Sequence, residues 1–449
     1  MIRRLSALVL AAVAAASAAA QKPDTAKLHA AIDQAVAKVT PQVIAWREDI
    51  HQHPELGNRE TRTAALVAAQ LKSLGITVRT GVAYTGVVGV LKGGKPGPVV
   101  ALRADMDALP VTEMVDVPFK STVRTTYNGQ EVGVMHACGH DNHVAILLGT
   151  ATVLAGMRAE LPGTVLFIFQ PAEEGPPAGE EGGASLMLKQ GAFDDPVPQA
   201  VFGLHVWPNR VGSVDTRAGT LLASAAGLRI VVHGKQTHGA QPWRGVDPIV
   251  VAAQIVLGLQ TIESRQLDLR KGAAVITVGA INGGNRGNII PDSVVMIGTV
   301  RTFVPGMEKD IAERIDRTAK MIAASAGATA ETQVVGGYEP TVNDGRLVAE
   351  MIPTMRSVVG DKLNAETLPV TPSEDFSEFA NRVPGMFVFL GIVPAGQDPL
   401  TAAPNHSPYF FADEGALPVG VKLMSYLAVD FLAKGGLPPA PKAKTASGR

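Results

Sequence analysis

Several short runs of this sequence are apolar at every position, and this feature constrains the fold most. The two clearest examples are Val165 to Phe169 and Met386 to Leu390. A strand covered by helices on both faces is apolar throughout, whereas a strand with one face in water alternates apolar and polar side chains. A helix is predicted from about Asn142 to Met157, between two such runs. Strands that alternate with helices indicate an α/β fold with a mixed, largely parallel sheet flanked by helices.

The length of 449 residues favours about two to three domains. From residue 220 to about 336 the sequence predicts strands near 228–232, 273–278 and 294–303 and helices over 248–265 and 307–326. This pattern indicates a small α+β domain inserted into a larger α/β unit of residues 21–219 and 337–434. The Pro-, Ala- and Lys-rich residues 435–449 have the composition of a disordered tail.

The N-terminus has the features of an export signal. Two arginines precede an apolar run from Leu5 to Ala16, and small residues stand before Gln21. This order is typical of a cleaved signal peptide over residues 1–20. We expect a periplasmic or secreted protein that is not membrane-bound after cleavage, because no later apolar run is long enough to span a bilayer.

The charge balance gives no sign of a polyanionic partner. The formal net charge is -1, and no basic stripe interleaved with aromatic residues is present. Nucleic-acid binding depends on a concentrated positive field. We therefore expect no nucleic-acid partner.

The only cysteine, Cys138, has three of the ten histidines within five positions, at 136, 140 and 143. Thiolate and imidazole are good ligands for zinc-like divalent ions. Further polar clusters follow apolar runs, at the strand ends where open α/β sheets bind ligands. They comprise residues 103–107, residues 170–175 and His205. Acids and histidines gathered in this way predict a metal site.

The spacing of Cys138 and His140 excludes one shared helix face, since residues at i and i+2 point in different directions. Gly139 between them permits a sharp turn. Asp141 either caps the following helix or supports His140. His143 is expected to be structural or to support a ligand, and the role of His136 stays open.

Glu173 and Glu174 are adjacent and would project in different directions from an extended backbone. One can then bind a metal ion while the other stays free as a general base. Metal-assisted hydrolysis needs this division of roles between ligand and base, because the metal activates water and a carboxylate transfers the proton of that water.

On these motifs the chain resembles the dinuclear metallopeptidases of the aminoacylase and glutamate-carboxypeptidase type. It looks most like the amidohydrolase branch, which includes hippurate hydrolases and auxin-conjugate hydrolases. The resemblance covers nearly all of the chain after the signal. Eight motifs carry it in sequence order: residues 51–57, 102–110, 135–143, 170–175, 203–208, 287–292, 373–376 and 405–408.

The resemblance implies a metal-dependent amidohydrolase or carboxypeptidase that hydrolyses an N-acyl amino acid or small peptide and releases a free amino acid. It implies two divalent ions, zinc or manganese, and an inserted domain that acts as lid and dimerises. The implied metal ligands are Cys138, His140, Glu174, His205 and His406.

Other residues take roles by the same resemblance. Glu173 falls at the general base, Asp107 at an acid that orients a ligand or the base, and Asp105 can support the site as well. His238 would reach the neighbouring subunit's site in a homodimer and stabilise the oxyanion. Asn288 and Arg301 would bind the substrate carboxylate.

Two departures from the family pattern leave the preferred acyl group and amino acid open. Gln236 stands near the lid histidine where small residues are usual, and the loop 175–183 is long and acidic.

Two other hypotheses are kept beside this one. Cys138 could be the nucleophile of a thiol hydrolase. The chain could also be a non-catalytic metal-binding periplasmic protein.

Overall fold

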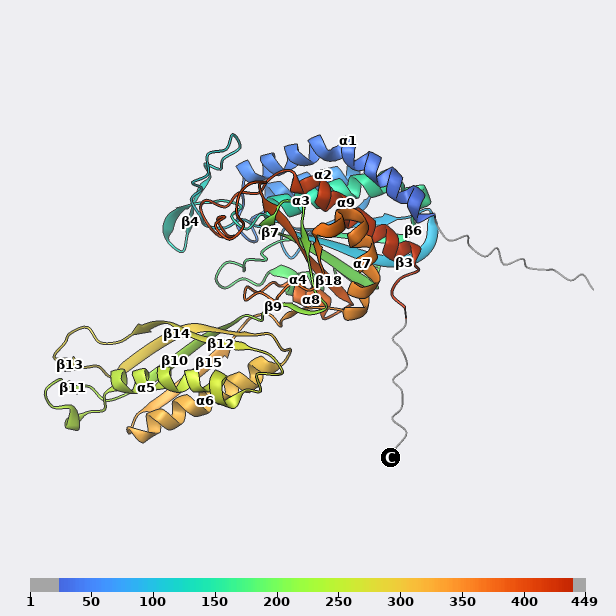
Figure 1. Ribbon diagram of the computed structural model, residues 1–449. Helices are drawn as coiled ribbons and strands as arrows, with labels where there is room; N and C mark the ends of the chain where they lie inside the picture. The colour runs from blue at the N-terminus through green and yellow to red at the C-terminus, as the bar shows by residue number, and fades with distance from the viewer. Residues whose placement is uncertain (1–23, 439–449) are drawn as a thin grey trace, which may run out of the picture.

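The computed structural model describes residues 24–438, which form two regions built on separate sheets (Figure 1). The larger region has one eight-stranded sheet in the order β1-β2-β6-β3-β7-β18-β8-β17. Its strands are β1 (Thr77–Val82), β2 (Gly86–Lys92), β3 (Lys95–Asp105), β6 (Pro162–Gln170), β7 (Ala200–Arg210), β8 (Val214–Asp215), β17 (Leu363–Asn364) and β18 (Gly385–Val393).

The four central strands β6, β3, β7 and β18 run parallel, β2 pairs antiparallel with β6, and β1 pairs antiparallel with β2. All nine residues of β18 are buried, as are eight of nine in β6. The mixed, largely parallel sheet predicted from the apolar runs is therefore confirmed. Because parallel strands end at the same edge, Asp105, Gln170 and His205 are carried to one side of the sheet.

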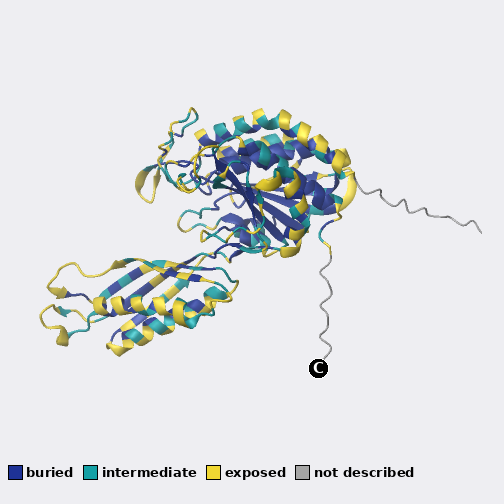
Figure 2. Cartoon of the chain, in the orientation of Figure 1, coloured by how far each residue is buried: buried dark blue, intermediate teal, exposed yellow. Residues whose placement is uncertain are grey.

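Helices cover both faces of this sheet. One hydrophobic core joins one face to a set of five helices, α1 (Thr25–Gln52), α2 (Thr61–Ser73), α3 (His140–Gly156), α7 (Gly345–Val359) and α9 (Ala416–Ala433). A second core joins the opposite face to α4 (Gly183–Lys189) and α8 (Phe376–Ala380). The burial colouring shows this enclosed sheet as the darkest part of the molecule (Figure 2).

Within residues 24–438, α9 is the one helix long and apolar enough to cross a membrane by length and composition. Most of it, 78%, is buried inside the protein. Its apolar character follows from its position against the sheet, where it contributes to the larger core.

The smaller region has a four-stranded antiparallel sheet in the order β12-β14-β10-β15 with its own core. Its elements are β10 (Ala226–His233), α5 (Pro248–Thr261), β12 (Ala274–Asn282), β14 (Ser293–Thr302), α6 (Met307–Ser325) and β15 (Thr329–Val335). The sequence did not predict β15, because this edge strand buries only one of its seven residues and lacks an apolar run.

Short pairings complete the described fold. Strand β9 (Gly219–Leu222) pairs with β16 (Thr341–Asn343) where the chain leaves for the smaller region and returns from it. Strand β11 (Thr237–His238) pairs with β13 (Ile289–Ile290), and β4 (Arg124–Tyr127) pairs with β5 (Gln130–Gly133). The predicted signal peptide and all but residues 435–438 of the predicted tail lie outside the described residues.

Candidate metal centre

The turn between Cys138 and His140 is formed as the sequence predicts. Gly139 has a positive φ of 90° and stands at the N-cap of α3. A Cβ atom at this position would lie 2.3 Å from Cγ2 of Val206. Glycine is therefore required both by the backbone conformation and by the close approach of β7.

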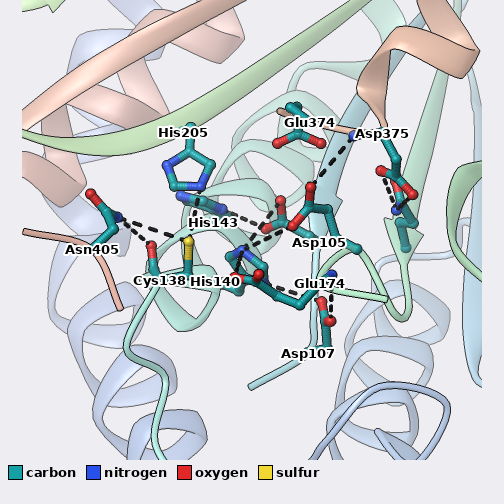
Figure 3. A network of polar contacts seen from close by, with 12 residues as sticks. Asp105, Asp107, Cys138, His140, His143, Glu174, His205, Glu374, Asp375 and Asn405 are labelled. Carbon is teal, nitrogen blue, oxygen red and sulfur yellow. Dashed lines mark hydrogen bonds and ion pairs between the residues drawn. The ribbon is translucent and has the colours of Figure 1, made fainter. Parts of the chain in front are cut away.

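The structure brings the five implied ligands together, although they come from segments far apart in sequence (Figure 3). The Cys138 Sγ atom lies 3.4 Å from His205 Nε2 and 3.3 Å from His406 Nε2. Oε1 of Glu174 lies 3.0 Å from His406 Nε2 and 3.9 Å from His140 Nε2. Ligands of one tetrahedral ion lie about 3.4 Å apart, given metal–nitrogen bonds of about 2.1 Å.

One donor atom in this cluster, His140 Nε2, is buried without a hydrogen-bond partner among the described residues. Buried polar atoms are normally paired, so this unpaired nitrogen needs an explanation. Burial lowers the pKa of His140, but Asp105, Asp107 and Glu174 outweigh it and raise that pKa to about 10. The surroundings therefore favour positive charge at this point. Thiolate, imidazole and carboxylate donors fit divalent ions of the zinc or manganese type.

Hydrogen bonds orient the histidines. Asp107 Oδ1 lies 3.1 Å from Nδ1 of His140, and Asp107 Oδ2 accepts the backbone N–H of Glu174 at 3.0 Å. His205 Nδ1 lies 2.7 Å from the carbonyl oxygen of Val206, which directs Nε2 toward Cys138. Metal-binding histidines usually make such a bond with the second ring nitrogen.

The histidine next along α3, His143, has a supporting position. Its Nε2 accepts the backbone N–H of Val206 at 2.8 Å, so Nδ1 carries the proton and donates to Asp105 Oδ1 at 2.5 Å. His143 and Asp105 thus hold β7 in place beside His205. This agrees with the structural or supporting role expected for both residues.

Glu173 lies beside the ligands but in a different environment from Glu174. One oxygen of Glu173 lies 3.9 Å from His140 Nε2, and the other accepts the backbone N–H of Asp375 at 3.4 Å. Burial raises the pKa of Glu173 well above its usual value, and Glu374, Glu174 and Asp375 raise it further. A carboxylate with this environment is suited to accept a proton near neutral pH.

A cavity of about 410 Å³ opens on the cluster. Cys138, Glu173, Glu174, His205 and His406 line it together with Arg301, so β14 of the smaller region contributes one implied carboxylate-binding residue. The remaining walls are largely apolar, with Trp207, Pro208, Leu222, Tyr338, Pro372 and Pro404, and also include the polar residues Ser373, Glu374 and Asn405.

His238 and Asn288 do not line this cavity. His238 belongs to β11 and Asn288 directly precedes β13, and Gly239 donates its N–H to the Asn288 carbonyl oxygen at 2.8 Å. Figure 1 shows the β11–β13 pairing at the end of the smaller region that points away from the large sheet. The structure thus separates these two residues from Arg301.

Asp141 has neither of its two expected roles. Gly139 is the N-cap of α3, and the helix has no side-chain cap. The Asp141 carboxylate instead accepts hydrogen bonds from Arg47 Nε at 3.0 Å and His51 Nδ1 at 2.9 Å, which ties α3 to α1. The sequence did not show this because α1 is about 90 residues away.

His136 is fully buried, and neither ring nitrogen has a hydrogen-bond partner among the described residues. Burial lowers its pKa to about 3. His136 therefore stays neutral and is not a member of the ligand cluster.

Sequence reasoning assigned no role to Arg103, Glu374 and Asp375, which form a buried charged group beside Glu173. Arg103 stands on β3 within an otherwise apolar stretch. An arginine on a strand buried on both faces needs carboxylate partners, and this signal could have identified the group.

The thiol of Cys138 has no environment that would make it a nucleophile. Burial raises its pKa well above the usual value, and Glu174 and Glu173 raise it further. Burial also lowers the pKa of the neighbouring His205, so this imidazole stays neutral beside the thiol. Ligation by a divalent ion is the arrangement that suits this thiol.

Comparison with known proteins gives a consistent result. The model of peptidase family M20/M25/M40 matches residues 101–430. The IAA-amino acid hydrolase ILR1-like 2 of Arabidopsis thaliana is 39% identical over 401 residues, which cover 88% of this chain and 87% of that protein. Thermostable carboxypeptidase 2 of Saccharolobus solfataricus is 39% identical over 404 residues, covering 89% and 98%.

A solved structure supports the same family assignment. The YxeP protein of Bacillus subtilis, described as a dinuclear metal-binding peptidase of the M20 family, superposes with a TM-score of 0.72 at 35% identity. The match covers 88% of this chain and 99% of that one.

Proposed function

Because this chain belongs to peptidase family M20/M25/M40, we propose that it is a metal-dependent amidohydrolase that releases a free amino acid from an N-acyl amino acid or small peptide. The observation that carries the proposal is a cluster of five metal-type donors, four of which line a cavity that also contains a separate buried carboxylate, Glu173. The thiol-hydrolase and non-catalytic alternatives have no such observation in their favour.

Cys138, His140, Glu174, His205 and His406 would hold two divalent ions, with Cys138 central because its sulfur lies near both His205 and His406. Zinc and manganese both suit this donor set. When bound, such ions supply Lewis acidity toward an amide carbonyl and make a nearby water acidic.

Glu173 is the general base of the proposed reaction. Its raised pKa lets it accept a proton from water and later deliver it to the leaving amine. Glu174 cannot share this role, because its Oε1 faces His406 and His140 within the donor cluster.

The cavity supports a substrate with one apolar part and one carboxylate. Trp207, Leu222 and Tyr338 provide apolar contact beside the donors. Arg301 uses Nη1 to donate to Ser373 Oγ at 2.9 Å and Ser224 O at 3.3 Å, and its other nitrogen donors can bind a carboxylate. The named activities of the two relatives, an IAA-amino acid hydrolase and a carboxypeptidase, fit such a substrate.

The active form is proposed to be a homodimer in which His238 acts on the partner's site. Ala240 donates its N–H to His238 Nδ1 at 3.0 Å, so a neutral ring carries its proton on Nε2 and can donate to an oxyanion. Edge strand β12 and helix α5 expose apolar side chains that a second subunit would cover, Ile249, Val250, Leu257, Val275 and Ile281.

Export is proposed on the N-terminal sequence alone. The basic start, apolar run and small residues before Gln21 favour a periplasmic or secreted location. N-terminal sequencing of the mature protein tests this, and a chain that keeps Met1 after secretion-competent expression would contradict it.

Glu173→Gln tests the function directly. The amide keeps the shape of the side chain but cannot act as a base, so kcat should fall about 10³-fold. Bound metal, measured by elemental analysis, should stay at the wild-type level, because the donor set is unchanged. The substrates are a panel of N-acetyl-, N-benzoyl- and dipeptide compounds.

Glu350→Gln makes the same chemical change at a solvent-accessible side chain of α7 and should keep full activity. Near-wild-type turnover by Glu173→Gln would contradict the assignment of the base. Full wild-type activity after complete removal of metal by chelation would contradict the proposed function as a whole.

A further inference from the structure

Arg103 is a fully buried arginine whose side chain forms four strong hydrogen bonds within one charged group. Nε donates to Gln170 Oε1 at 2.8 Å, and Nη1 donates to Asp105 Oδ2 at 2.6 Å. Nη2 donates to Glu374 Oε1 at 2.8 Å and to Asp375 Oδ1 at 3.0 Å. One guanidinium thus joins the ends of β3 and β6 to the loop 373–375.

The loop bound by Arg103 contacts Glu173 directly. Asp375 donates its backbone N–H to Glu173 Oε1 at 3.4 Å, and oxygens of Glu173, Glu374 and Asp375 all lie within 4.8 Å of one another. Glu374 and Glu173 also line the same cavity. Figure 3 shows Glu374 and Asp375 on the side of the site away from Asn405.

Three acids so close together repel one another unless a cation holds them. Within residues 24–438, Arg103 is the one arginine or lysine that forms ion pairs with Asp105, Glu374 or Asp375. A buried carboxylate without a partner is unfavourable by several kcal/mol, as an order of magnitude. The position of the loop, and of Glu173 against it, therefore depends on this guanidinium.

We propose that Arg103 is a positioning residue for the general base, acting through Glu374 and Asp375 to hold the Glu173 carboxylate beside the metal donors, where it takes a proton from the attacking water. This inference rests on the proposed function, because it assumes that Glu173 is the base. Arg103 itself is buried beneath the cavity and does not line it, so it has no direct contact with substrate.

The same loop also reaches the implied substrate contact. Arg301 donates to Ser373 Oγ at 2.9 Å, one residue before Glu374. Thr341 Oγ1 donates to the carbonyl oxygen of Glu374 at 3.1 Å. Residues 373–375 are therefore held from the cavity side by Arg301 and from the core side by Arg103. The general base Glu173 and the implied substrate contact Arg301 thus both bind the same tripeptide.

The geometry requires an arginine rather than a positive charge alone. The planar fork of a guanidinium can bind Gln170, Asp105, Glu374 and Asp375 at once, whereas a lysine ammonium has three donors at one point. Arg103→Lys keeps the charge but loses the fork. It should displace Glu173 slightly and leave the metal donors in place.

The test is a double-mutant cycle of Arg103→Lys with Glu173→Gln. In the wild-type background Arg103→Lys should lower kcat about 10²-fold, as expected for a misplacement near 1 Å, with KM and bound metal nearly unchanged. In the Glu173→Gln background the same substitution should change kcat less than about threefold, because there is no base left to position. Equal losses in both backgrounds would overturn the proposal.

Arg47→Lys is the matched structural control, since Arg47 is also fully buried and pairs with two carboxylates, Asp141 and Glu414. It should lower the melting temperature and leave kcat within about threefold of wild type. If Arg103→Lys does not fold, Glu374→Gln replaces it in the cycle, because it weakens the same tie without removing the cation. Additive losses with Glu374→Gln would equally overturn the proposal.

Failure of this proposal is distinct from failure of the proposed function. If Glu173→Gln alone keeps its activity, the base assignment is wrong. If Glu173→Gln is inactive but Arg103→Lys turns over at the wild-type rate, the function stands and the positioning role of Arg103 is wrong.

Discussion

Three residues at the metal centre have left-handed backbone conformations, which are costly for residues with a Cβ atom. Gly139 has φ 90°, Ala172 directly before Glu173 has φ 50°, and His406 has φ 69°. Such conformations persist only where the surrounding structure imposes them, and they are frequent at functional sites. Here they turn the chain sharply beside Cys138, beside the glutamate pair and at the last ligand.

Gly139→Ala should damage the site itself. The new methyl group would meet Val206 Cγ2 at 2.3 Å on a backbone with positive φ, so the turn between Cys138 and His140 must shift. We expect a stability loss of about 1–3 kcal/mol and a loss of bound metal. Elemental analysis and urea unfolding measure the two effects.

Gly156→Ala is the control for that substitution. Gly156 ends α3, and a Cβ there meets nothing within 4 Å. It should leave metal content unchanged and stabilise the protein by up to about 1 kcal/mol. If Gly139→Ala binds a full complement of metal, the turn does not control ligand placement.

At the scale of elements, α1 is joined to α3 by a buried polar cluster rather than by apolar packing alone. His51 near the end of α1 contacts Asp141 Oδ2 through Nδ1 at 2.9 Å and Glu113 Oε1 through Nε2 at 3.2 Å. Arg47 donates to the same Asp141 oxygen at 3.0 Å. The cluster therefore stabilises the packing of α1 against α3.

The cluster predicts a pH dependence of stability. Burial and Arg47 lower the pKa of His51, but Asp141 and Glu113 outweigh them, and the net pKa is raised. A histidine with a raised folded-state pKa contributes stability that is fully present below its unfolded value of about 6.5 and lost as pH rises through the folded-state value.

The measurement is the difference in free energy of unfolding between wild type and His51→Gln in urea at pH 6 and pH 9. It should be larger at pH 6. His53→Gln, a change at an exposed histidine two residues away, should show no such difference. A wild-type advantage that is equal at both pH values would show that His51 is not charged in the folded protein.

At the scale of the whole molecule, the position of His238 decides whether one chain is sufficient for catalysis. Its β11–β13 pairing lies at the end of the smaller region away from the large sheet (Figure 1). Arg301, from the same region, lines the cavity of its own chain. In the proposed homodimer, His238 of the partner subunit would complete the site, and closed twofold symmetry would give both sites the same arrangement.

Mixing two inactive variants tests this arrangement. Glu173→Gln and His238→Ala should each have low activity alone. A mixed dimer has one intact site, formed by Glu173 of one subunit and His238 of the other. Random co-assembly should therefore restore about a quarter of wild-type activity, because about half of the dimers are mixed and each has one working site.

The control is the two variants purified separately and then combined without refolding or co-expression. This sample should stay inactive if subunits do not exchange. Light scattering gives the oligomeric state of each sample. No recovery in confirmed mixed dimers would mean that His238 acts within its own chain or not at all.

The sequence by itself determined the larger sheet and the donor types of the site. Runs such as Val165 to Phe169 specify buried parallel strands, because only full burial on both faces favours unbroken apolar sequence. Parallel strands also bring their ends to one edge, so acids and histidines after those runs predict a shared site. The turn at Gly139 could be predicted locally, because Cys138 and His140 can reach one metal site only if the chain turns between them.

Only the tertiary structure decided which polar groups meet across distant segments. Asp141 pairs with Arg47 and His51 on α1, rather than capping its own helix, and Arg103 joins loop 373–375 to Glu173. Such pairings depend on packing between elements, whereas local patterns report only on burial and backbone conformation. The separation of His238 from Arg301 is likewise a matter of three-dimensional arrangement, because both belong to one inserted segment of the chain.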